Sequence, residues 1–308
     1  MMQVGQLRAF LAVAEERHFT RAARSLGMAQ PSVSAHVRRL EAELGTALFD
    51  RARGNIALTP AGDTLLPFAR RIVADVDAAA DDLRSLGGLA RGRIAIGATP
   101  SLAATLLPAV LSRFHGAYPG IDLAIRQAGS VELVAAVEEG AVDLALVILP
   151  VRHDVLETQA LLREELVVAV SRGHPLARRR TIAIGDLRDV PLVMFREGYD
   201  LRTATEAACR AAGFAPTFAV EGGEMDGVLR LTAAGLGAAI VPSLVVTPHG
   251  DLHAVRIARP SLTRTIGLAH RRDRRLSRAG QELLETVRAL VRDRSWLKTS
   301  PPGLTVLR

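Results

Sequence analysis

Three short helical patterns open the chain, and their spacing restricts the fold more than any other part of the sequence. The first is an apolar stripe at helical intervals: Leu7, Phe10, Leu11 and Ala14. A second pattern begins at Thr20, which can cap a helix, and stops at Gly27. The third begins at Pro31, which suits a first helical position, and stops at Gly45. Short helices joined by a tight turn predict a helix-turn-helix within residues 20–44.

A long helix is predicted from Pro60 to Leu86, after a turn or hairpin over residues 48–60. Its apolar residues step by alternating four and three positions: Leu65, Ala69, Ile72, Val76, Ala79, Leu83 and Leu86. This is the spacing of a coiled-coil seam, so we expect two copies of the chain to pair along it. A helix that packs on its own domain would show a similar stripe and remains the alternative.

Strand and helix patterns alternate beyond Gly88. Strands are expected at 93–97, 121–126 and 144–148, with helices at 102–114 and 131–139 between them. A second such unit begins at 166–171, and a last helix covers 277–290. This order implies parallel sheets flanked by helices, and hence two α/β lobes, about 91–161 with 266–295 and about 162–265. The tail 301–308 has no pattern and is expected to be disordered.

Composition narrows the possible partners. The chain of 308 residues carries a formal net charge of +7, which favours nucleic acid or acidic ligands, although genomic base composition also enriches arginine. Cys209 is the only cysteine, so neither a disulfide within the chain nor a cysteine metal cluster can form. The start lacks a signal-peptide pattern, and the longest apolar stretch, 231–246, is too short to cross a bilayer. These features predict a cytoplasmic protein without a membrane partner.

The residues expected to face DNA lie mainly on the third helix. Glutamine can pair with adenine and arginine with guanine, while arginines beside the hairpin can reach phosphates or the minor groove. The predicted set is Thr20, Arg21, Gln30, Pro31, Ser32, Ser34, His36, Arg38, Arg51 and Arg53. Simple solvation is the alternative for the glutamine and the serines, and His36 could instead cap or solvate its turn.

At these positions the chain resembles the LysR-type transcriptional regulators. The matching residues are Leu7-Arg8-Ala9-Phe10, Phe19-Thr20-Arg21-Ala22-Ala23, Leu26, Gln30-Pro31-Ser32-Val33-Ser34, Leu40-Glu41, Leu44-Gly45, Leu48-Phe49, Arg51, Leu58-Thr59-Pro60-Ala61-Gly62 and residues 233–242. The resemblance implies a winged helix-turn-helix (1–60), a dimerising linker helix (61–88) and an effector domain folded like a periplasmic binding protein (89–300). It also implies homo-oligomers, usually tetramers.

An effector site is expected between the lobes, where strand carboxyl ends meet helix amino ends. The predicted residues are Thr99, Pro100, Ser101, Gln127, Ser130, Ile148, Phe195 and Arg196. Hydroxyls, backbone N–H groups and an arginine suit a small organic anion such as a carboxylate. In the alternative, Thr99 and Ser101 cap a helix and Arg196 is solvated.

The sequence differs from the peroxide-sensing members of this family at a position that matters for redox chemistry. Peroxide-sensing members of the family use two cysteines nine residues apart in the second lobe. Here Asp200 stands where the reactive cysteine would be, and Cys209 fits the partner position. A disulfide switch within the chain is therefore excluded, and Cys209 is expected to pack as a small apolar residue.

The predicted function is that of a sequence-specific transcriptional regulator. Its partners are double-stranded promoter DNA, a small-molecule effector, further copies of itself as a homodimer or homotetramer, and RNA polymerase. Neither a metal nor another cofactor is expected, and no nucleophile or metal-ligand pattern indicates an enzyme. The N-terminal helices argue against a periplasmic solute-binding protein. A non-specific architectural DNA-binding protein remains the alternative.

Overall fold

The computed structural model divides into two compact units, 1–88 with 138–141 and 89–137 with 142–308. It describes residues 1–50, 56–85, 92–151, 153–246, 250–297, 301 and 303–307. Each unit has its own hydrophobic core and is taken by itself below.

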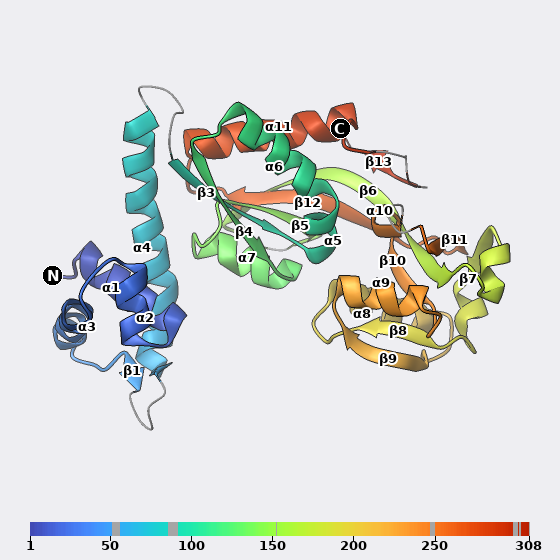
Figure 1. The fold of residues 1–308 in the computed structure, drawn as a ribbon, viewed down its shortest axis with the longest axis horizontal. Coiled ribbons are helices and arrows are strands. Elements are labelled where there is room, and N and C mark those ends of the chain that lie inside the picture. The colour runs from blue at the N-terminus through green and yellow to red at the C-terminus, as the bar shows by residue number, and fades with distance from the viewer. Residues whose placement is uncertain are drawn as a thin grey trace. The chain divides into compact units, whose positions relative to one another are not determined.

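The first unit is a small helical domain with a two-stranded hairpin (Figure 1). Its elements are α1 (Val4–Glu16), α2 (Phe19–Ser25), α3 (Gln30–Leu44), β1 (Phe49–Asp50), β2 (Ala57–Leu58) and α4 (Pro60–Ser85). Phe10, Val37 and Leu40 are fully buried, which packs α1 against α3. The predicted hairpin is confirmed, because Phe49 pairs with Leu58 in an antiparallel ladder.

Two of the predicted helix starts lie one or two residues too late in the chain. The ring nitrogen Nδ1 of His18 accepts a hydrogen bond from the Thr20 backbone N–H, 3.1 Å away, so His18 and not Thr20 caps α2. Pro31 is the second residue of α3, after Gln30. The predicted stop is confirmed, since Gly45 ends α3 with φ at +67°, in the left-handed region that glycine adopts readily.

The apolar seam predicted along α4 is corrected at Ala69. This residue is fully buried in the core of its own domain, so the start of α4 completes that core. Leu65 packs against the same core, and Leu86 lies outside the described residues. Among the described residues of α4, the large apolar side chains that are exposed are Phe68, Ile72, Val76 and Leu83, which we call the α4 stripe. Ala79 of the predicted seam is exposed as well.

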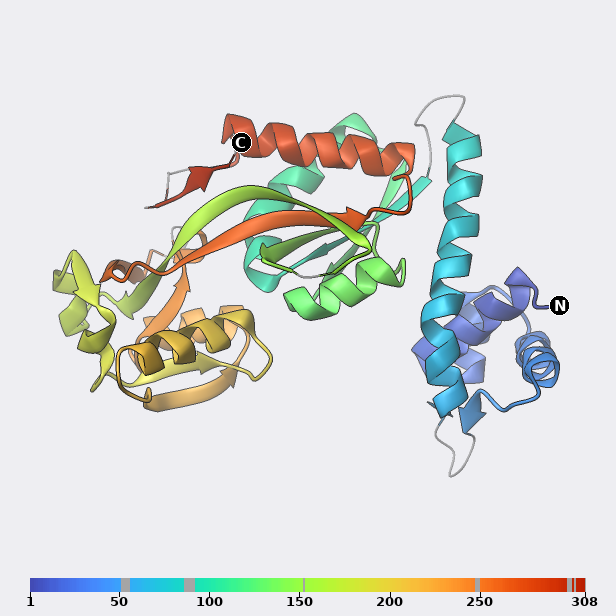
Figure 2. The ribbon, with the colours of Figure 1, turned by 180° about the vertical axis from the view of Figure 1, so that it is seen from behind.

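The first lobe of the second unit is a mixed sheet covered by helices on both faces. Its strands are β3 (Gly92–Ala98), β4 (Ile121–Gln127), β5 (Leu144–Leu149), β6 (Leu156–Ser171) and β12 (Thr263–Arg271). Helices α6 (Leu106–Ala117) and α11 (Arg278–Asp293) lie on one face and α7 (Ser130–Glu138) on the other, while α5 (Pro100–Ala104) precedes α6 (Figures 1 and 2). Strands β3, β4 and β5 are parallel as predicted, but β12 runs antiparallel to β5 and β6.

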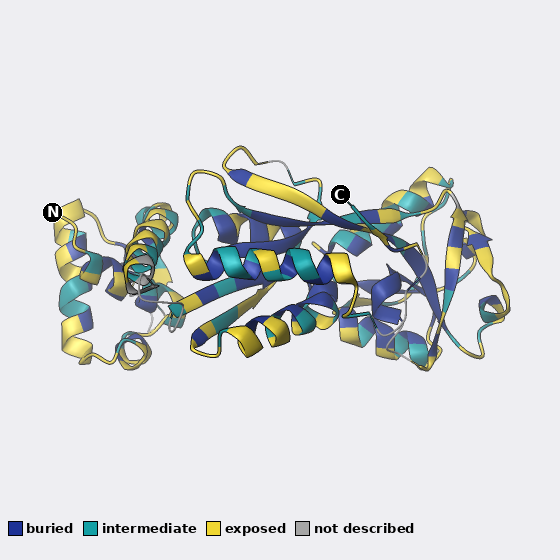
Figure 3. Cartoon of the chain, turned by 90° about the horizontal axis from the view of Figure 1, so that it is seen from above, coloured by how far each residue is buried: buried dark blue, intermediate teal, exposed yellow. Residues whose placement is uncertain are grey.

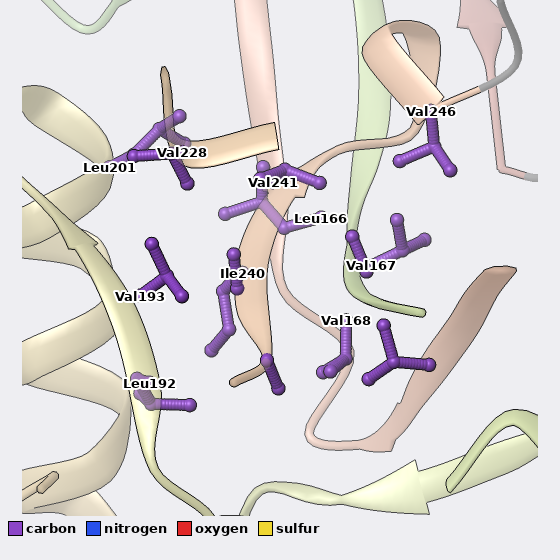
Figure 4. Packing of buried hydrophobic residues seen from close by; sticks show 14 of the residues in the cluster. Leu166, Val167, Val168, Leu192, Val193, Leu201, Val228, Ile240, Val241 and Val246 are labelled. Atoms are coloured by element: carbon purple, nitrogen blue, oxygen red, sulfur yellow. The ribbon is translucent and has the colours of Figure 1, made fainter. Parts of the chain in front are cut away.

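The second lobe packs around a core of small branched side chains (Figure 4). Its elements are β7 (Thr181–Ala183), β8 (Leu192–Phe195), α8 (Asp200–Ala211), β9 (Phe218–Gly223), α9 (Met225–Ala233), β10 (Ala239–Pro242), α10 (Ser243–Val246) and β11 (Leu252–Arg259). Val168, Val193 and Ile240 are buried there on three different strands. Strands β8 and β10 are buried along their whole length, whereas β4 and β9 are mostly half-buried or exposed. In the burial view the helices expose one face (Figure 3).

The long strand β6 belongs to both lobes. Its first part pairs antiparallel with β12 as far as Glu165. From Leu166 onward the same strand pairs with β10 and β11 of the second lobe. The crossover therefore falls between Glu165 and Leu166, four residues later than the predicted boundary at 161/162.

The prediction of a disordered tail is wrong for the described part of residues 301–308. Thr305 and Val306 form strand β13, which pairs antiparallel with Arg163 and Leu162 of β6. The N–H of Leu307 donates to the carbonyl of Leu161, 2.9 Å away. A two-residue strand gives no periodic signal, which explains why sequence analysis missed it.

Truncating Leu304, a side chain of the C-terminal tail that packs in the first-lobe core, should destabilise the effector domain. Leu304 is 8% exposed and packs in that core. We expect Leu304→Ala to lower the unfolding free energy by about 2 kcal/mol, as buried leucine truncations do. Urea unfolding measures the change, with Leu236→Ala as control because Leu236 is 43% exposed. Equal midpoints for the two variants would contradict the packed tail.

Candidate DNA-binding and effector sites

The polar residues of α3 form a line on the surface of the helix. Gln30 and Arg38 are exposed and Ser34 is half-buried, and the three are spaced four residues apart. Side chains at this spacing lie on one helix face. The Gln30 amide donates to the Ser34 hydroxyl at 3.0 Å, which orients both side chains along this line.

The other residues predicted to face DNA differ in their surroundings. Thr20, Pro31 and Ser32 are exposed, as predicted. Arg21 is exposed but its Nε donates to the Glu16 carboxylate at 3.2 Å, which holds the guanidinium against its own domain. His36 is half-buried and turns toward α1, since a Cβ on Gly5 would lie 3.7 Å from its ring. Arg51 and Arg53 lie outside the described residues.

Two predicted effector residues of the first lobe each bond to the backbone of β5. The hydroxyl of Ser130, at the start of α7, accepts from the Ile148 backbone N–H at 3.1 Å. Thr99 donates its backbone N–H to the carbonyl of Leu146, also on β5, at 3.3 Å. The Thr99 side chain is buried and its hydroxyl has no hydrogen-bond partner among the described residues. Such an atom costs free energy unless a ligand or water completes it.

Ser101 takes part in a buried polar network that sequence analysis did not predict. Its hydroxyl accepts from a terminal N–H of Arg264 at 2.9 Å. The Nε of Arg264 donates to Glu164 at 2.7 Å, and the backbone N–H of Leu244 donates to the other oxygen of that carboxylate at 3.3 Å. Glu164 and Arg264 are cross-strand partners on β6 and β12, 100 residues apart in the chain. No local pattern in the sequence connects them.

The predicted effector residues of the second lobe are less available to a ligand than expected. The Phe195 side chain is 1% exposed and belongs to the lobe's core, where its ring stacks on Tyr199 at 4.8 Å between centroids. Arg196 is paired with Glu224 at 2.5 Å, so a ligand carboxylate would compete with that glutamate. Gln127 is exposed, and Pro100 is buried at the start of α5.

Tyr199 and Asp200 lie at the lobe junction, although the prediction did not include them in the site. Asp200 accepts a hydrogen bond from the Ser130 hydroxyl at 2.7 Å. The Tyr199 hydroxyl is buried, and burial raises the pKa of this phenol, which therefore stays protonated at neutral pH.

Cys209 packs in the second-lobe core as predicted, because it is fully buried on α8. Burial, with a smaller contribution from Glu206, raises the pKa of its thiol. A protonated, buried thiol is a poor nucleophile, which agrees with a packing role. Within the described part of the chain, no group of three or more acidic, histidine or cysteine side chains could hold a metal ion. No helix in that part is long and apolar enough to cross a membrane.

Together, the helix-turn-helix, the hairpin and the two-lobed domain define a class of DNA-binding regulators with a ligand-binding domain. The family model of the lysR-family bacterial regulatory helix-turn-helix matches residues 4–63, and that of the LysR substrate binding domain matches residues 87–292. The chain therefore belongs to the LysR family of DNA-binding transcriptional regulators, whose activity an effector modulates. A non-specific architectural role is not favoured by this membership.

Relatives and solved structures agree along almost the whole chain. The transcriptional dual regulator GltC of Bacillus subtilis is 34% identical over 93% of this chain and 96% of its own length. OxyR of Escherichia coli is 29% identical over 94% and 95%. The structure is similar to a full-length Pseudomonas aeruginosa OxyR with a cysteine-to-aspartate substitution (TM-score 0.75, 25% identity, 98% and 99% covered). It also resembles CbnR bound to its target DNA (TM-score 0.69, 27% identity, 94% and 99% covered).

Removing one partner of the buried ion pair should strongly destabilise the effector domain. Glu164 is fully buried and the Arg264 side chain is 7% exposed, so Glu164→Gln leaves a buried guanidinium without its counter-charge. The expected loss is about 3–5 kcal/mol of unfolding free energy, measured by urea unfolding.

The matched control removes a carboxylate from a solvated pair on the same domain. Asp226 and Arg230 form an exposed pair on α9, and Asp226→Asn should cost less than about 1 kcal/mol. If the Glu164 and Asp226 variants were equally stable, the buried pair would have no special role in the fold.

Proposed function

We propose that this regulator reads promoter DNA through the face of α3 that carries Gln30, Ser34 and Arg38. The observation that carries the proposal is the line formed by exposed Gln30, half-buried Ser34 and exposed Arg38 on a helix whose opposite side is buried. Glutamine recognises adenine and arginine recognises guanine in the major groove. Thr20, Arg21, Pro31 and Ser32 would contact the adjoining backbone, and so would Arg51 and Arg53 of the wing.

The proposed effector site lies between the lobes, at Ser130, Thr99 and Ser101. The support is the buried Thr99 hydroxyl, which has no hydrogen-bond partner among the described residues, and the Ser130 hydroxyl at the first turn of α7, since both residues bond to the backbone of β5. Hydroxyls and a helix amino end suit a small organic anion such as a carboxylate. Ligand binding there would shift the population between two arrangements of the oligomer, which changes how the DNA is held.

The chain would work as a homodimer or homotetramer at the promoter, where it would contact RNA polymerase. It would act in the cytoplasm, where promoter DNA is found, and would perform no catalysis. The α4 stripe would supply the pairing surface, because large exposed apolar side chains on one helix gain from association.

Footprinting of DNA upstream of the chain's own gene, with and without a panel of small carboxylates, tests the regulatory role. Discrete protection that one compound alters is the expected result. Uniform, salt-sensitive coverage would instead indicate architectural binding.

Arg38→Ala should weaken specific binding by about 1–3 kcal/mol, because it removes one base contact. Fluorescence anisotropy on the footprinted site, at one fixed salt concentration, measures the change. Arg292→Ala is the control, since Arg292 is an exposed arginine on α11 of the effector domain and its loss removes the same charge. Equal Kd values for the two variants would remove Arg38 from the base-reading set.

Val76→Asp should shift the chain from dimer to monomer in sedimentation equilibrium. Val76 is 40% exposed in the middle of the α4 stripe, and a buried carboxylate at a paired surface is strongly unfavourable. Thr64→Asp, at an exposed polar position on the same helix, should leave the oligomeric state unchanged. A dimer that survives Val76→Asp would mean that the chains pair elsewhere.

A further inference from the structure

One hydrogen bond joins the two lobes at the proposed effector site. Ser130 begins α7 in the first lobe, and Asp200 begins α8 in the second. The Ser130 hydroxyl donates to Oδ2 of Asp200 at 2.7 Å while it accepts from the Ile148 N–H. Ser130 is 4% exposed, so this contact is shielded from solvent, where a hydrogen bond to a charged group is strongest.

The backbone on either side of this bond is also close. A Cβ added to Gly129 would lie 3.6 Å from the Gly198 carbonyl oxygen, so the loops that precede α7 and α8 are near van der Waals contact. Tyr199 is 6% exposed, with its ring stacked on Phe195 and beneath the Arg196 guanidinium. The chain's own side chains therefore fill this part of the lobe junction.

We propose that Asp200 is an internal ligand that occupies the carboxylate position of the effector site. This inference rests on the proposed function, in which Ser130 binds an organic anion. A small carboxylate would make the same hydrogen bond with Ser130 that Asp200 makes now. Both cannot accept the single Ser130 proton at once, so an effector carboxylate binds by displacing Asp200.

The charges around the site strengthen this competition. Arg264 is neutralised by Glu164, and Arg196 by Glu224, so neither of these two guanidinium groups is left to favour a free anion over Asp200. Asp200 is tethered beside Ser130 and acts at a high effective concentration, whereas a free carboxylate must bind from solution. Its position in the first turn of α8 adds a favourable interaction with the helix dipole. The tethered carboxylate thus sets the effector concentration at which the lobes respond.

Acetate binding to the full-length Asp200→Ala variant tests the inference directly. Sodium acetate is titrated against sodium chloride at matched ionic strength, and the thermal transition of the effector domain is followed. With the internal carboxylate removed, acetate should raise the transition temperature. Its half-saturating concentration should be at least about tenfold lower than for the parent protein, the factor expected from a hydrogen bond to a charged group. The parent should respond weakly or not at all.

Two further variants locate the acetate. Asp200→Ala combined with Ser130→Ala should lose the response, because the donor is gone. Asp226→Ala also removes an acidic residue from the first turn of a second-lobe helix, α9, and should behave like the parent. Asp200→Asn preserves the side-chain shape without the charge, so its acetate response should fall between those of the parent and Asp200→Ala, even if the alanine variant folds poorly.

The inference is overturned if the parent and Asp200→Ala respond equally, if neither Asp200 variant responds, or if the response survives loss of Ser130. None of these measurements involves DNA. Discrete footprints without acetate binding would therefore refute the internal ligand and leave the regulatory function standing. Acetate binding by Asp200→Ala together with uniform DNA coverage would support the internal ligand and refute the sequence-specific regulatory function.

Discussion

The buried ion pair between Glu164 and Arg264 is the contact on which the effector domain depends. It lies where β6 leaves the first lobe, one residue before the crossover. The Glu164 carboxylate accepts a hydrogen bond from the Leu244 N–H of α10, and the Arg264 guanidinium donates one to the Ser101 hydroxyl of α5. Because an unpaired charge in this position is very costly, the pair favours one register of β6 against β12. The register in turn fixes which residues of β6 enter each lobe.

A second set of contacts covers the same crossover from outside. Glu165 forms two hydrogen bonds with Arg256 of β11, at 2.7 and 2.9 Å. A Cβ on Gly303 would lie 2.2 Å from the Glu165 side chain, so the tail approaches this pair too closely for any larger residue. Strand β13 then continues along the edge of β6. The crossover is thus held by neighbouring glutamates, one inside the domain and one beneath the tail.

Local patterns predicted the elements that local forces determine. The helices of the first unit and the hairpin followed from apolar spacing, glycine stops and turn residues, and three parallel strands followed from their order. The pairing of Glu164 with Arg264 and of Ser130 with Asp200 was missed, because each joins residues 70 or more positions apart. Ala69 was misassigned for a related reason: an apolar stripe does not say which partner covers it. Of the predicted effector residues, Ser130 bonds to the second lobe, but the sequence did not indicate its partner Asp200.

The side chain at position 200 bears on the kind of signal that the lobe junction can receive. In the peroxide-sensing pattern a cysteine at this place changes state by forming a covalent bond, which needs an oxidant and a second thiol. Asp200 has no such chemistry, and Cys209 is buried with a raised thiol pKa. An aspartate can change its partners only by reversible exchange of hydrogen bonds, which a dissolved anion can drive by mass action. Asp200 links the lobes through Ser130, and in our proposal this link responds to the concentration of an anion and not to oxidation.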